Sequence, residues 1–79
     1  MNTDIYFLSK QLAKAIAEKY GEGDVLSQGI IDAIDYGNSS GEILMKVRFF
    51  LREFVKNSND AELVQAAKAI IDDISLLIK

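Results

Sequence analysis

The chain has 79 residues, 49% of them hydrophobic, and a formal net charge of −3 at pH 7. It contains no cysteine, which excludes disulfides and thiolate–metal sites, and no histidine, which removes the commonest metal ligand and the usual general base near neutral pH. A chain this short is expected to form a single domain, residues 1–79, and to bury only roughly 60–65% of the surface that its unfolded form exposes.

We expect no targeting or membrane-spanning segment. The N-terminal residues lack a basic stretch followed by an apolar one, and no apolar run approaches the ~20 residues that span a bilayer. The absence of cysteine is compatible with a reducing compartment. The expected location is therefore the cytoplasm, with no membrane partner.

The first half of the chain contains two segments with helical periodicity. The first runs over about residues 3–20 and stops at Gly21, and the second runs over about residues 24–37, with Asp24 as its N-cap and Gly37 at its end. The residues expected to face the core are Ile5, Leu8, Leu12, Ala15, Ile16, Tyr20, Leu26, Ile30, Ala33 and Ile34.

The second half contains two more such segments. The third covers about residues 40–57. Ser39 precedes its first turn and Glu42 lies within that turn, which is the spacing of a capping box. The fourth covers about residues 60–78. The residues expected to face the core are Ile43, Leu44, Val47, Phe50, Leu51, Phe54, Val55, Leu63, Ala67, Ile70, Ile74 and Leu77.

Asn59 and Glu62 repeat the capping-box spacing at the start of the fourth segment. No segment shows a sustained strand-like alternation, and there is no internal repeat. Four amphipathic helices joined by short loops predict an all-α fold, an antiparallel four-helix bundle.

The third helix carries apolar residues on the side opposite its core face. Met45 and Phe49 lie there one helical turn apart, and Arg52 and Lys56 continue the same row. One interpretation is that the first or fourth helix covers Phe49. The other is an interaction surface, because aromatic residues, Met and Arg are enriched at protein interfaces.

The second helix is expected to present an acidic outer face. Asp32 and Asp35 lie there with Gln28, flanked by Ile31 and Tyr36, and no basic residue on this helix offers a local partner. This face suits either solvent or a cationic protein surface. It argues against direct binding of nucleic acid, which requires a basic footprint.

The sequence does not favour an enzyme. A nucleophile needs an adjacent base, and no histidine or cysteine is available. Asp32 and Asp35 alone make a poor metal site, and the "GEGD" segment lacks the lysine of a phosphate-binding loop. We therefore expect no catalytic residue, cofactor or metal.

The central stretch of the chain, residues 32–54, reads "DAIDYGNSSGEILMKVRFFLREF". It combines an acidic helix, a loop with glycine, and an arginine-containing amphipathic helix that starts with an "EI-L-M" pattern. In these features it resembles small immunity proteins of bacterial toxin systems. Such proteins are encoded beside contact-dependent or polymorphic toxins and bind the toxin domain in the cytoplasm of the producing cell. The resemblance implies a helical protein that blocks the active site or substrate access of a cognate toxin.

A nuclease toxin would present a cationic cleft, which an acidic protein can occupy as a mimic of phosphate. The candidate partner-binding residues are Asp32, Asp35 and Glu42 for charge, Tyr36 as an aromatic anchor, and Met45, Phe49 and Arg52 as a second patch. The alternative from another class is a helical homodimer, an adaptor or regulatory subunit that buries Met45 and Phe49 between its two copies.

Overall fold

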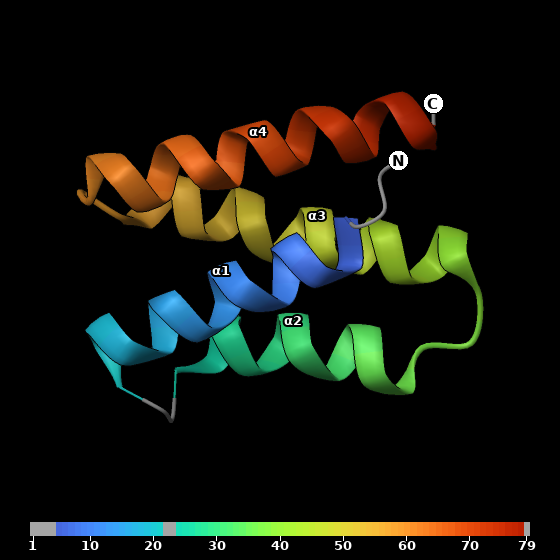
Figure 1. Cartoon of the computed structure of the whole chain (residues 1–79), viewed down its shortest axis with the longest axis horizontal. Coiled ribbons are helices and arrows are strands. Elements are labelled where there is room, and N and C mark those ends of the chain that lie inside the picture. Colours follow the sequence, from blue (N-terminus) through green and yellow to red (C-terminus); the bar gives the residue numbers. More distant parts are fainter. Residues whose placement is uncertain (1–4, 22–23, 79) are drawn as a thin grey trace.

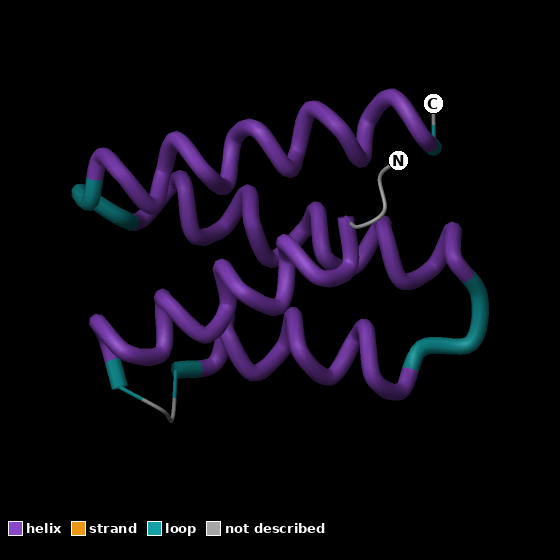
Figure 2. Tube along the Cα trace, in the orientation of Figure 1, coloured by secondary structure: helices purple, strands orange, loops and turns teal. Residues whose placement is uncertain are grey.

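The computed structural model describes residues 5–21 and 24–78, and these residues form four helices packed as a bundle. The helices are α1 (Ile5–Tyr20), α2 (Val25–Tyr36), α3 (Ser40–Asn57) and α4 (Ala61–Leu77). Figure 1 shows that each helix crosses the length of the molecule. Figure 2 shows helices and loops, and no strand, within the described residues. The predicted all-α bundle is confirmed, and the predicted start of the first helix at residue 3 lies outside the described residues.

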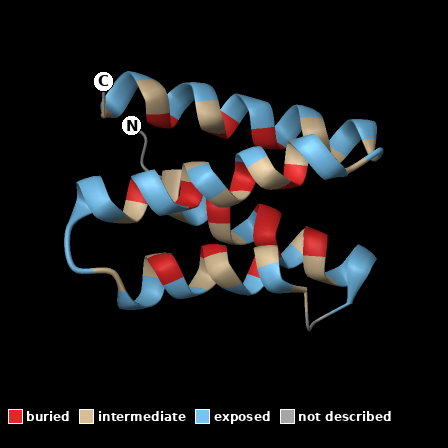
Figure 3. Ribbon diagram, turned by 180° about the vertical axis from the view of Figure 1, so that it is seen from behind, coloured by how far each residue is buried: buried red, intermediate tan, exposed pale blue. Residues whose placement is uncertain are grey.

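The helices form a ring in which each packs on two neighbours. α1 packs on α2 and α4, and α3 packs on the same two helices from the other side. Figure 3 shows the buried residues along the faces that the helices turn toward one another. The buried apolar residues are Leu12, Ala13, Ile16, Ile30, Ala33, Leu44, Val47, Leu51, Phe54, Ala67, Ile70 and Ile74.

Side-chain caps begin α2 and α3 at the predicted residues. The backbone N–H of Ser27 donates to the carboxylate of Asp24 over 2.9 Å, and the backbone N–H of Glu42 donates to the hydroxyl of Ser39 over 3.3 Å. Each cap satisfies an N–H that has no partner inside its helix.

The cap of α4 lies one residue later than predicted. Asp60, and not Asn59, accepts a hydrogen bond from the backbone N–H of Leu63 over 3.0 Å. Asp60 also forms an ion pair with Lys19 at the end of α1. The hydrogen bond from Lys19 lowers the pKa of the Asp60 carboxyl and raises the pKa of the Lys19 ammonium. This contact joins the end of α1 to the start of α4, a tertiary constraint that no local spacing contains.

The core face of α1 differs from the predicted one. Leu8 is 47% exposed, whereas its neighbour Ser9 is 1% exposed and Ala13 is fully buried. α1 is turned so that small side chains face the bundle, and Leu8 therefore lies at the edge. Leu77, at the last turn of α4, is also exposed.

Ser9 and Ser27 are both buried, but only one has a hydrogen-bond partner. The Ser27 hydroxyl donates to the carbonyl oxygen of Asp24 over 3.2 Å, whereas the Ser9 hydroxyl has no partner. A buried polar group without a partner lowers stability, because it loses its hydrogen bonds to water without replacement.

We expect Ser9→Ala to raise the free energy of unfolding by about 1 kcal/mol and Ser27→Ala to lower it by about 0.5–1 kcal/mol. Both variants replace serine with the better helix former alanine, so the contrast between them reports mainly on the hydroxyl group. Urea denaturation followed by circular dichroism measures both values. Equal effects of the two substitutions would show that the Ser9 hydroxyl is satisfied in solution.

Candidate functional site

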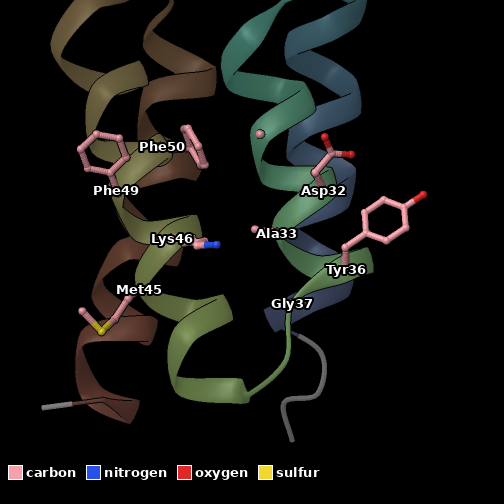
Figure 4. Close-up of a pocket in the computed structure, with 9 residues that line it drawn as sticks. Asp32, Ala33, Tyr36, Gly37, Met45, Lys46, Phe49 and Phe50 are labelled. Carbon is pink, nitrogen blue, oxygen red and sulfur yellow. The ribbon is translucent and has the colours of Figure 1, made fainter.

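An open groove of about 660 Å³ runs between α2 and α3. The two helices contribute nearly equally to its walls, and Figure 4 shows their side chains. The lining residues are Gly29, Asp32, Ala33, Tyr36, Gly37, Met45, Lys46, Phe49 and Phe50. The groove therefore contains four of the seven predicted partner-binding residues, namely Asp32, Tyr36, Met45 and Phe49.

Three small residues, Gly29, Ala33 and Gly37, line the groove on the α2 side and form its floor. Gly29 and Ala33 are four residues apart on one face of α2, and Gly37 follows directly after the last residue of the helix. A Cβ atom on Gly29 would lie 2.7 Å from Cζ of Phe50, and one on Gly37 would collide with the side chain of Ile43. The two glycines thus allow large side chains of α3 to pack directly against the α2 backbone.

In the middle of this contact between α2 and α3, the α3 side chain is a charged one and not a large apolar one. Between Ile43 and Phe50, the α3 residue that points toward Ala33 is Lys46, as Figure 4 shows. The Lys46 side chain is half exposed, and its ammonium lies 3.9 Å from the carboxylate of Glu42. A solvated lysine cannot fill an apolar space between helices, and the groove is open at this level.

Large apolar side chains stand at the edges of the groove in contact with solvent. Tyr36 is 79% exposed, Met45 58% and Phe49 57%. The Phe49 ring packs edge-on against Phe50, with ring centroids 5.5 Å apart, and Phe50 points between the two helices. Neither α1 nor α4 covers Phe49, so the interpretation in which a neighbouring helix buries it is wrong.

The two aspartates of the acidic face have different surroundings. Asp35 forms an ion pair with Lys10 of α1 over 2.8 Å. Asp32 lines the groove and accepts a hydrogen bond from the side-chain amide of Gln28 over 2.9 Å. The cation that offsets Asp35 thus comes from another helix, and the carboxylate of Asp32 is the one that stands at the groove.

Three of the predicted partner-binding residues do not line the groove. Asp35 faces α1, Glu42 lies near Lys46, and Arg52 is exposed farther along α3. Sequence reasoning in turn missed the floor residues Gly29, Ala33 and Gly37 together with Lys46 and Phe50. The four-residue spacing of small side chains in α2 is the signal that could have indicated them.

Comparison of the chain with models of protein families, with curated proteins and with solved structures found no match. Among residues 5–21 and 24–78, no group of three or more carboxylates is placed to hold a metal ion. None of the helices in that part of the chain is both long and apolar enough to cross a membrane. The groove, with its exposed aromatic edges, is the surface feature on which a function can be based.

The glycine floor can be tested by adding a single methyl group. In Gly37→Ala the new Cβ would lie 2.5 Å from the carbonyl oxygen of Ala33, a backbone atom that cannot move aside cheaply. We expect this variant to lose about 1–3 kcal/mol of unfolding free energy.

Gly41→Ala is the matched control, since a Cβ at Gly41 meets nothing within 4 Å. It should gain up to about 1 kcal/mol from the better helix propensity of alanine. Thermal and urea denaturation of both variants check these values. A Gly37→Ala protein as stable as Gly41→Ala would contradict the tight packing of Gly37 against Ala33 at the end of α2 and against Ile43 of α3.

Proposed function

We propose that this chain is an immunity protein of a bacterial toxin system, a binding protein and not an enzyme. Its antiparallel helical bundle would act in the cytoplasm, where it binds a cognate toxin domain and covers the toxin's active site or substrate surface. The observation that carries the proposal is the groove between α2 and α3, whose edges expose Tyr36, Met45 and Phe49 to solvent.

The chemistry of the groove edges supports binding to a protein. Aromatic residues and Met are enriched at protein interfaces, and a few such residues supply most of the binding energy. Three large side chains that are each more than half exposed on two adjacent helices would gain from burial on a partner.

The position of the groove also supports the proposal. The stretch that resembles immunity proteins, residues 32–54, covers the end of α2, the loop after it and most of α3. Every residue that lines the groove, except Gly29, lies in this stretch. The resemblance and the exposed apolar surface thus coincide on the same two helices.

The charge of the molecule favours a cationic partner. The net charge is −3, and Asp32 presents a carboxylate at the groove itself. A nuclease domain binds phosphate through basic residues, so an acidic protein can approach it rapidly and occupy the same surface. Inhibition then follows from exclusion of the substrate.

Asp32→Lys tests this proposal on one charge. The substitution changes an exposed side chain that forms no ion pair in the described part of the chain, so the fold should persist. With the toxin domain encoded by the neighbouring gene, we expect slower association and a complex weakened by about tenfold, because like charges now meet. Asp35 is unsuitable for this test, since its replacement would also break the ion pair with Lys10.

Asp72→Lys is the matched control, because Asp72 is an exposed carboxylate on α4, outside the groove. It should bind the toxin domain nearly as the unmodified chain does. Association should also slow as salt rises, since the screening length falls to about 8 Å near physiological ionic strength. Unchanged binding and cell protection by Asp32→Lys would refute a role for this carboxylate.

A further inference from the structure

The two walls of the groove carry opposite charges. Asp32 stands on the α2 wall and Lys46 on the α3 wall. In the part of the chain that the structure describes, Asp32 forms no ion pair, and Lys46 forms a long, exposed ion pair with Glu42 of its own helix, over 3.9 Å. An exposed pair of this kind contributes little, so the Lys46 ammonium can exchange Glu42 for a carboxylate of a molecule that lies across the groove.

Both walls also carry large exposed side chains, Met45 and Phe49 on α3 and Tyr36 on α2. The small residues Gly29 and Ala33 also line the groove. A partner that fits this surface should offer exposed apolar side chains and charges of both signs. A second copy of the same surface has both.

A twofold axis brings these features together in one orientation. If the axis runs along the helices, α2 of each copy faces α3 of the other, and Asp32 of one copy meets Lys46 of its partner at two equivalent places. If the axis runs across the helices, α2 faces α2, and Asp32 meets a second Asp32. The charges favour the first arrangement and oppose the second.

We infer that a second copy of this chain closes the groove when no other protein is bound. A standard interface takes about 800 Å² from each partner. That area is about a sixth of the 4954 Å² surface of this chain, a share that one two-helix face of a four-helix bundle can supply. The dimer covers Phe49 and Met45, and it places Lys46 beside a carboxylate of the other copy.

This inference adds a means of regulation to the proposed function, because a toxin that binds the same groove must displace the second copy. Only this regulatory role rests on the proposed function. The dimer itself depends only on the groove. Its test therefore uses the purified chain without any toxin, and failure of the dimer leaves the toxin-binding proposal standing on its own experiment.

Two complementary variants test the dimer. In Asp32→Lys both walls carry positive charge, and in Lys46→Glu both walls carry negative charge, so each variant repels itself. Mixed in equal amounts, the two variants restore opposite charges at both contact points. Circular dichroism of each variant checks that these substitutions at exposed positions leave the fold intact.

Sedimentation or light scattering measures the mass over a range of concentrations. The unmodified chain should rise from 8.8 kDa toward twice that mass, each variant alone should remain near 8.8 kDa at concentrations where the unmodified chain dimerises, and the mixture should regain the doubled mass. Asp72→Lys, outside the groove, should dimerise like the unmodified chain.

Three results would overturn the inference. The unmodified chain could stay at 8.8 kDa at every concentration, each single variant could dimerise as well as the unmodified chain, or the mixture could fail to regain the doubled mass. If either variant fails to fold, Phe49→Ala replaces it, and dimerisation undiminished by that substitution also overturns the inference.

Discussion

The contact between α2 and α3 is the constraint on which the surface of this protein depends. Gly29 and Gly37 allow Phe50 and Ile43 to pack against the α2 backbone at two levels. Between these levels stands Lys46, whose charged end cannot be buried in an apolar contact without a partner. The groove runs over this contact, and its lining includes the two glycines and Phe50 as well as Lys46.

The same arrangement separates stability from binding. Residues such as Val47 and Leu51 on the inner face of α3 are fully buried in the bundle, whereas Met45 and Phe49 on its outer face are left to solvent. One helix therefore packs into the core with one side and, in the proposed function, offers its other side to a partner. The charges follow this division, since Asp35 is used in an ion pair with α1 while Asp32 remains at the groove.

Periodicity predicts the helices well, because α2, α3 and α4 each bury a regular apolar face and begin at a capping residue. It fails where tertiary packing decides. Leu8 has the right spacing for the core face, yet α1 turns Ser9 and Ala13 inward and leaves Leu8 at the edge of the bundle. Periodicity also cannot find the cation that Asp35 pairs with, since Lys10 is 25 residues away in the chain.

The central claim is that the α2–α3 groove is the surface through which this protein binds other proteins, including its own second copy. The most direct measurement is the backbone amide NMR spectrum of the full chain as its own concentration is raised. We predict shift changes concentrated in residues 29–37 and 43–50, which build the groove. Changes confined to the outer faces of α1 and α4, around Leu8 and Leu76, would contradict the claim.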